Sequence, residues 1–563
     1  MILFFAAALA AEVAPASLAL QTALEAELSR SAALKLPDAP APWLVIFDAL
    51  DGTVHEAGAE DGALYRSQHA PFRNLRVEVR VGDAIVDSSN YSGFGEPDGI
   101  QSRRLPVEDG LVALRREAWL AADAAYKNAV ETLSRKLAAR KGLKEASPPD
   151  YQVLPPLVRP AGPHPGNAFT AQEVDDLARR LSAAASVDGV ESAEAEVRDW
   201  HGWRLRLDSA GSRAWAATGN VVVRVGAVVR RDDGSEVRDA RWWIGRDATS
   251  LPSAAAMEDE VRLLAASLLE TAAAPAPKPW LGPVIFEGEA AAELFSQLLA
   301  PELVGTRAEE SAPGSFFSAG ATPMARIGRR LLPEGWSAWD DPSTRTGAAG
   351  EYEIDHEGVA PRRVDAVVDG VVRDVLMSRI PSKERASSTG HGRALGNDRR
   401  GALPGFVHVT APRLITESAM RKRAMKLARS VGQEQVLVVR RLTPAAMVQS
   451  LEVSVSGEGP MSGLTAPYEA CLLQLDGSCV PARNLRFVGV DRRLLRDIVA
   501  AAPGAGRVDM LDGPPGPSRY TIGTTGGAPT SWDVPSVLVS EVELDPADGG
   551  EPRVLRIGRA GTP

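Results

Sequence analysis

Hydrophobic and polar positions alternate between helical and strand periods along the first half of the chain. Apolar residues spaced three and four positions apart predict helices over 17–36, 110–140, 171–185 and 254–273. Alternating or short continuous apolar runs predict strands over 43–48, 75–81, 203–207, 221–230 and 237–244. Glycine-containing turns are predicted between them at 50–52, 82–83 and 232–234. This pattern predicts an α+β region.

The pattern changes after residue 280, where short apolar runs are separated by glycine and proline turns. Helices are predicted only near 287–300, 416–430 and 491–502. Short strands separated by turns are typical of antiparallel pairing. The expected fold class is therefore α+β, with an N-terminal α+β region followed by a β-rich C-terminal module.

Segments rich in proline and alanine suggest where the chain divides. Proline is frequent over 146–170, and an alanine–proline stretch occupies 274–279, as expected for linkers or extended segments. The predicted regions are an apolar segment, an N-terminal α+β region, a proline-rich linker, a middle α+β region and the C-terminal module, over 1–16, 17–145, 146–170, 171–275 and 280–563.

The N-terminal apolar run resembles the hydrophobic part of a signal peptide. It extends from Ile2 to Ala11, and the small residues Ala14 and Ala16 are suitable for a cleavage site. No Lys or Arg precedes Arg30, so the positively charged start of a signal peptide is absent. The run favours an exported, periplasmic protein over a cytoplasmic one with a buried N-terminal segment. It is too short to cross a bilayer, and we expect no integral membrane segment.

Composition limits the classes of function. The 563 residues are 44% hydrophobic and 24% charged, as in ordinary globular proteins of several domains. The formal net charge of −10 argues against nucleic acid as a general partner, because phosphate binding needs a basic surface. The sequence contains no phosphate-binding loop, dinucleotide fingerprint or serine-hydrolase elbow in a suitable setting.

The two cysteines flank a predicted hairpin turn. With a two-residue Asp476-Gly477 turn, Gln474 would lie opposite Cys479, and Cys471 would lie three positions further along. That separation exceeds what a disulfide tolerates, so two reduced cysteines are predicted. With no third thiol or neighbouring histidine, they do not form a metal cluster.

Four motifs in the region 282–393 occur in a characteristic order. They are Gly-Pro-Val-Ile-Phe-Glu-Gly-Glu-Ala-Ala-Ala-Glu-Leu-Phe at 282–295, Trp-Asp-Asp-Pro at 339–342, Asp-His-Glu-Gly-Val at 355–359 and Ser-Thr-Gly-His-Gly-Arg at 388–393. This order resembles the TldD/PmbA family of metalloproteases. The resemblance is specific in 280–400 and weak over 40–270, and it implies a C-terminal module of the TldD/PmbA type.

The resemblance implies that the zinc site of the family is absent from this chain. In the TldD branch a helix carries His-Glu-x-x-x-His, and these three positions correspond here to Glu287, Gly288 and Ala292. The third ligand of the family, a cysteine, corresponds to 526–528, where the sequence has no cysteine. Catalytic zinc needs three protein ligands, and glycine cannot act as a general base. The chain thus resembles the PmbA/TldE branch, with no catalytic residue, metal or cofactor expected.

Two classes of function remain open. The resemblance implies a non-catalytic, TldE-like subunit that pairs with a TldD-type zinc protease as a heterodimer, or that forms a homodimer, and acts on unfolded peptides. The alternative is a stand-alone exported protein that binds peptides, or a peptidase with an unidentified site. Whether the chain is itself an enzyme stays undecided at this level.

The candidate substrate groove consists of Glu287, His391 and Arg393. If the family arrangement holds, the junction at 284–292 and the loop at 388–393 lie across one cleft, and Arg393 binds a peptide carboxylate. The alternative for the loop is a tight turn with a structural role. The paired acidic residues at 340–341 and 355–357 are interpreted as turn and edge residues, and the basic helix over 420–429 as solvated.

Overall fold

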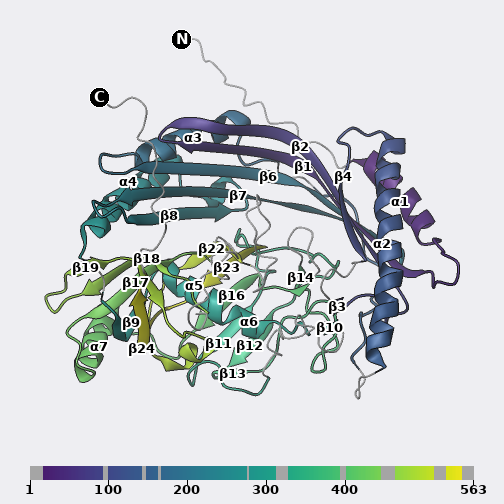
Figure 1. Cartoon of the computed structure of the whole chain (residues 1–563). Helices are drawn as coiled ribbons and strands as arrows, with labels where there is room; N and C mark the ends of the chain where they lie inside the picture. Colours follow the sequence, from purple (N-terminus) through teal and green to yellow (C-terminus); the bar gives the residue numbers. More distant parts are fainter. Residues whose placement is uncertain are drawn as a thin grey trace, which may run out of the picture.

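The computed structural model describes residues 17–92, 99–141, 147–162, 166–275, 278–307, 309–311, 327–393, 401–444, 463–512 and 528–547. A sheet of long N-terminal strands arches over a β-rich C-terminal module, and helices cover the opposite side and one end of this sheet (Figure 1). The α+β fold class expected from the sequence is confirmed. None of the described helices is long and apolar enough to cross a membrane.

The N-terminal sheet has seven strands in the order β4-β2-β1-β6-β7-β5, with β8 paired to β7. The strands are β1 Pro42–Glu60, β2 Ala63–Val81, β4 Ile100–Arg104, β5 Val158–Arg159, β6 Ser192–Asp208, β7 Arg213–Arg230 and β8 Glu236–Gly245. Strands from both sides of the proline-rich stretch at 146–170 pair directly, since β1 pairs with β6 along almost its whole length.

The two faces of this sheet differ because successive side chains of a strand point to opposite sides. Odd positions of β1, such as Val45, Phe47 and Ala57, pack against the helices. Even positions of β1 point to the other face, where Leu44 and Ile46 pack with Tyr151 and Asp48 is buried. On the neighbouring β6, Arg206 reaches the C-terminal module. One face of the sheet therefore holds an apolar core and the other face carries charge.

Four helices form two pairs at the two ends of the apolar face (Figure 1). They are α1 Leu18–Ser31, α2 Leu111–Arg140, α3 Ala171–Ala185 and α4 Ala254–Ala273. The bounds of α3 and α4 agree with the sequence prediction because both have strong N-caps. Thr170 and Glu173 form a capping box, and Ser253 caps α4.

The C-terminal module contains two larger sheets. One has the order β19-β18-β17-β9-β24-β20 with β21 on β24, and the other has the order β13-β12-β11-β16-β23-β22. The first comprises β9 Trp280–Phe286, β17 Val436–Leu442, β18 Pro467–Leu473, β19 Cys479–Ala482, β20 Leu485–Phe487, β21 Ile498–Ala502 and β24 Ser536–Pro546. The second comprises β11 Ser337–Asp340, β12 Val364–Val368, β13 Val371–Val372, β16 Phe406–Thr410, β22 Arg507–Asp512 and β23 Ala528–Asp533.

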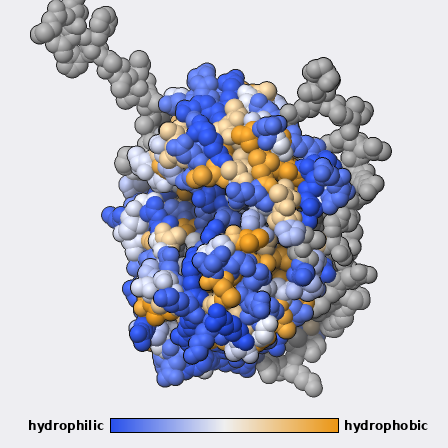
Figure 2. Space-filling view, turned by 90° about the vertical axis from the view of Figure 1, so that its left-hand side faces the viewer, coloured by the Kyte–Doolittle hydropathy of each residue, from blue (hydrophilic) through white to orange (hydrophobic). Residues whose placement is uncertain are grey.

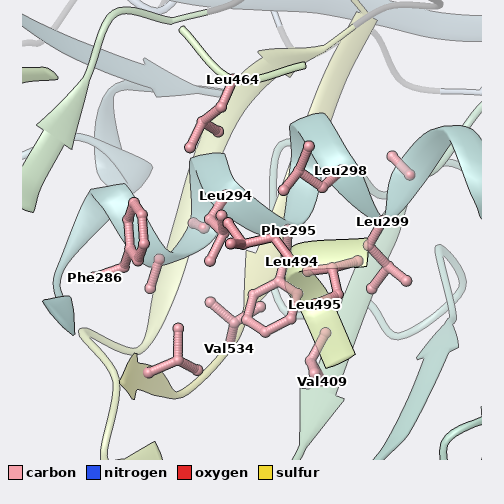
Figure 3. Packing of buried hydrophobic residues seen from close by; sticks show 14 of the residues in the cluster. Phe286, Leu294, Phe295, Leu298, Leu299, Val409, Leu464, Leu494, Leu495 and Val534 are labelled. Atoms are coloured by element: carbon pink, nitrogen blue, oxygen red, sulfur yellow. The ribbon is translucent and has the colours of Figure 1, made fainter. Parts of the chain in front are cut away.

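Further elements lie outside these larger sheets and the four N-terminal helices. They are β3 Tyr91–Ser92, β10 Glu310–Ser311, β14 Gly392–Arg393, β15 Gly401–Ala402, α5 Glu289–Leu298, α6 Ala300–Leu303, α7 Glu417–Ser430 and the 3₁₀ helices η1 Ala248–Ser250 and η4 Arg492–Asp497. Helix α5 contributes to the main core, where Leu294, Phe295 and Leu298 pack with Leu495 and Val534 (Figure 3).

Polar contacts join the charged face of the N-terminal sheet to the C-terminal module. Arg241 of β8 pairs with Glu289 of α5 at 2.8 Å, and Arg441 of β17 pairs with the buried Asp239 of β8. The Arg206 guanidinium donates to the carbonyl of His356 at 3.1 Å. The view of one side of the molecule shows a band of hydrophilic side chains between two apolar patches (Figure 2).

The predicted turn at 50–52 is wrong, because β1 continues through it to Glu60. Gly52 lies opposite Gly202 of β6, and a Cβ atom on Gly52 would lie 2.3 Å from the carbonyl oxygen of His201. Glycine inside a strand marks a close approach of two backbones as well as a turn. Here the glycine permits close pairing of long strands.

The helix predicted over 491–502 is also wrong. Only the short η4 forms there, and the chain continues as β21, which pairs with β24. Antiparallel pairing dominates the described strands of the C-terminal module, as expected. The exceptions among its named strands are the parallel pairs β17–β9, β16–β23 and β10–β3.

The prediction of reduced cysteines is wrong, because Cys471 and Cys479 form a disulfide with a Cα–Cα distance of 5.5 Å. The turn is longer than two residues, so Leu473 rather than Gln474 lies opposite Cys479. Cys471 is then two positions from the residue opposite Cys479, which places both sulfur atoms on one face of the hairpin.

We expect loss of this disulfide to destabilise the chain moderately. Closing so short a loop stabilises the folded state by about 2 to 3 kcal/mol in the chain-entropy model. The variant Cys471→Ser/Cys479→Ser should lower the free energy of unfolding in urea by this amount. Dithiothreitol should lower it equally in the wild type and leave the variant unchanged. Detection of two free thiols in the unreduced, denatured protein would contradict the assignment.

Candidate functional site

The junction between β9 and α5 is the place where the sequence resemblance predicts the zinc-ligand positions. Glu287 follows the last residue of β9, and its amide donates to the carbonyl of Val439 at 3.0 Å. Gly288 then caps α5 with φ of 62°, in the left-handed region that favours glycine. A glutamate general base at position 288 would have to adopt this strained backbone or change it.

The Glu287 carboxylate is bound by two guanidinium groups from distant elements. Arg421 of α7 donates to its two oxygens at 2.9 and 3.2 Å, and Arg440 of β17 donates through Nε at 3.0 Å. Burial lowers the pKa of Arg440, but hydrogen bonding and charge from Glu287 outweigh it and leave that pKa raised. Two fixed cations therefore neutralise the one remaining carboxylate of the vacant motif.

The third position of the motif is closed to solvent. Ala290, Ala291 and Ala292 are each 0% exposed, because the first turn of α5 packs into the main core (Figure 3). Methyl groups give close contact between a helix and a sheet but contribute no donor atom. Position 292 therefore has neither a ligand nor an open side toward water.

The residues present do not fit a catalytic zinc ion. Such an ion needs three protein ligands and an open position for water. Glu287 is already paired, positions 288 and 292 have no donor, and both cysteines are joined in a disulfide. Gly526 and Gly527, at the position of the third ligand, lie outside the described residues. Across the described part of the chain, no cluster of three or more metal-ligating side chains occurs.

His391 lies in the interior of the C-terminal module. Its ring is 0% exposed, and Nδ1 lies 2.9 Å from the hydroxyl of Thr389. Nε2 lies 3.6 Å from the Asp340 carboxylate, which itself accepts the backbone amides of Gly405 and Phe406 at 2.8 and 3.0 Å. The backbone of His391 joins neighbouring segments, since its amide donates to the carbonyl of Met377 at 3.4 Å and its carbonyl accepts the amide of Leu403 at 3.0 Å.

Arg393 lies in the same interior region. Its guanidinium donates to the carbonyls of Pro404 and Pro529 at 2.8 and 2.9 Å and lies 5.1 Å from the centre of the Tyr352 ring. The side chain is 6% exposed. Arg393 thus connects loops that are far apart in sequence.

The described contacts do not bring the three groove residues together. Glu287 bonds with arginines of α7 and β17, whereas His391 and Arg393 both contact Tyr352. No hydrogen bond or ion pair of Glu287 within the described residues involves His391 or Arg393. A shared substrate groove stays a prediction, and the burial of His391 and Arg393 favours the structural alternative for the loop.

A buried acidic pair supports this loop. Asp355 accepts the amides of Glu357, Val359 and Gly392, each at 2.8 Å. Burial and the neighbouring Glu357 carboxylate raise the pKa of Asp355 to about 7. Asp355 therefore holds the predicted turn and is also a titratable group in the protein interior.

Sequence reasoning missed Arg421 and Arg440 as partners of Glu287. The basic run over 420–429 was interpreted as a solvated helix, yet Met420, Ala424 and Ala428 are buried and direct Arg421 toward the junction. The available signal was Arg440, a charged residue directly after the buried run Val436–Val439.

We expect the stability of the chain to depend on pH through Asp355. A carboxyl group whose pKa is raised by folding stabilises the folded state fully below its unfolded value near 4, and this contribution is lost as pH rises through about 7. Glu357→Gln removes a charge that raises this pKa. The fall in unfolding free energy between pH 5 and 8, limited to about 1.4 kcal/mol per pH unit for one proton, should become shallower.

Urea denaturation at four pH values between 5 and 8 measures this slope. The matched control is Glu334→Gln, since Glu334 is exposed. Equal slopes in the wild type and Glu357→Gln would contradict the assignment.

Comparison with protein families gives a match in the C-terminal part of the chain. Residues 281–460 match the PmbA/TldA metallopeptidase C-terminal domain. Comparison with the sequences of curated proteins gives no match.

Solved structures resemble nearly the whole chain. TldE from Thermococcus kodakarensis has a TM-score of 0.58 at 14% identity, over 93% of this chain and 99% of that one. A candidate modulator of DNA gyrase from Thermotoga maritima has a TM-score of 0.57 at 15% identity, over 93% and 99%. A similarly described protein from Bacteroides thetaiotaomicron has a TM-score of 0.56 at 12% identity, over 93% and 98%.

At these identities the structures establish the fold, and the match over 281–460 adds sequence evidence in the region of the four motifs. Residues 281–460 therefore belong to the PmbA/TldA metallopeptidase C-terminal domain family, and nearly the whole chain has the fold of these solved structures.

Proposed function

We propose that this chain is the non-catalytic, TldE-like subunit of a metalloprotease complex that acts on unfolded peptides. The observation that carries this proposal is the state of the β9–α5 junction. A carboxylate paired with Arg421 and Arg440 and a buried Ala292 occupy positions where a catalytic chain needs zinc ligands.

The physical cost of restoring a metal there supports the same role. A zinc ion bound by Glu287 would have to displace two guanidinium groups that satisfy this carboxylate. Charge-assisted hydrogen bonds of this kind are among the stronger ones in proteins. The junction is therefore suited to a stable structure, and we assign zinc binding and hydrolysis to a partner that carries His-Glu-x-x-x-His.

We further propose an exported location. Disulfides form and persist in oxidising compartments and are rare in the cytosol. The Cys471–Cys479 bond supports export, in agreement with the apolar segment over 1–16, which lies outside the described residues.

Purification from the native host tests the proposed role. A tagged copy of this chain should retain a second chain that carries His-Glu-x-x-x-His, and zinc measured by atomic emission should follow that chain. The complex should cleave an unfolded peptide such as denatured casein, whereas the isolated chain should not. About one zinc ion per isolated chain after dialysis, or cleavage by that chain alone, would overturn the proposal.

A substitution at position 292 tests the closed state of the junction. Ala292→His should lower the free energy of unfolding by about 1 to 3 kcal/mol, because a larger side chain overpacks a filled core. Ala292→Ser, which adds one oxygen atom, is the small control and should cost less. A histidine tolerated without loss of stability would show that position 292 opens toward solvent.

A further inference from the structure

A second feature of the C-terminal module is a cavity of about 360 Å³ lined mainly by arginines. The cationic side chains are Arg329, Arg330, Arg492, Arg493 and Arg496, and the one acidic side chain is Glu302. The chain as a whole has net charge −10, so this concentration of positive charge is opposite to the overall balance. Glu287 and its arginine partners do not line this cavity.

Among the described residues, two of these arginines form no side-chain hydrogen bond or ion pair. Arg492 pairs with Glu302 at 3.2 Å, Arg493 pairs with Asp491 at 2.9 Å, and Arg330 donates to the carbonyl of Asp369 at 3.0 Å. Within the described residues, Arg329 and Arg496 make no such bond.

The backbone that carries these arginines is held firmly in place. Gly328 and Leu331 donate to carbonyls of the β12–β13 hairpin at 2.8 Å each. In η4, the Asp491 side chain caps the first turn, and Leu494 and Leu495 are buried in the main core. Arg493 and Arg496 are three residues apart and lie on one side of this 3₁₀ helix. The backbone positions of the positive groups are therefore set before a ligand arrives, while the exposed guanidinium groups can turn toward it.

The floor of the cavity is apolar. Val372 is 1% exposed and Leu331 is 6% exposed, and both line it. Guanidinium groups bind carboxylate and phosphate oxygens through paired hydrogen bonds, and small-molecule sites begin at about 300 Å³. An apolar floor with a cationic rim suits an organic anion better than an inorganic ion.

We propose that this pocket binds a small organic anion carrying two or more phosphate or carboxylate groups. Arg329 and Arg496 supply the unpaired charge, and Arg492 and Arg493 add donors beside them. The confined cavity favours a small molecule over an extended acidic peptide. This site is independent of the peptide-directed role proposed above.

Isothermal titration of the full chain with fructose 1,6-bisphosphate and with citrate, at one ionic strength kept with sodium chloride, tests the proposal. Arg329→Gln/Arg496→Gln should weaken binding of the tighter probe by about tenfold or more. Arg329→Lys/Arg496→Lys keeps the charge but loses paired hydrogen bonding, so it should lose less. Tighter binding of fructose 1,6-bisphosphate assigns phosphate groups to the ligand, and tighter binding of citrate assigns carboxylates.

The matched control is Arg116→Gln/Arg413→Gln, which removes two exposed arginines outside the pocket. It should bind both probes as the wild type does. If the pocket variant and the control variant weakened binding equally, the loss would be explained by net charge alone, and the proposed site would be overturned. Failure of both probes to bind below about 1 mM, or tighter binding of a tetra-aspartate peptide, would also overturn the proposal. Unfolding midpoints of all variants verify that they are folded.

Discussion

The close packing of helix α5 into the core is the constraint on which the rest of the C-terminal module depends. Three consecutive alanines, 290 to 292, are fully buried, and Leu294, Phe295 and Leu298 continue the same contact with both sheets. Interiors of this density tolerate little added volume. The helix that would carry zinc ligands in a catalytic relative is here a packing element, and its small residues are a condition of that packing.

Ion pairs balance the negative charge of Glu287 at the β9–α5 junction. In a metal site, a cation draws carboxylate and imidazole groups together. Here the guanidinium groups of Arg421 and Arg440 supply the positive charge, and both are attached to elements that pack against β9 or α5. The ion pairs therefore join α7, β17 and the β9–α5 junction without an external ion.

Arginine has a different role at each of the three places considered. Arg441 and Arg206 join the N-terminal sheet to the C-terminal module, and Arg393 connects buried loops through carbonyl oxygens. In the cavity beside η4, two lining arginines form no hydrogen bond or ion pair with other described side chains. Net charge, which is negative for the chain, does not predict such local concentrations, because they arise when segments distant in sequence fold together.

Much of the fold could be predicted from the sequence. Helices such as α3 and α4 have local caps and a strong period, so their limits follow from neighbouring residues. The full length of strand β1 cannot be predicted locally. Whether Gly52 marks a turn or a close pairing of two strands depends on Gly202, which lies opposite it on another strand. The disulfide was missed for a related reason, because the length of a turn decides the register of its strands.

The candidate site was harder to predict, for a physical reason. The sequence identifies which residues occupy the motif positions, and this is enough to question zinc binding. The partners of Glu287 lie 134 and 153 residues away, so no local pattern connects them. The burial of His391 likewise depends on Asp340 and Tyr352, which belong to separate segments. A glycine-rich loop that resembles a ligand-binding turn in sequence becomes a buried connector once these segments surround it.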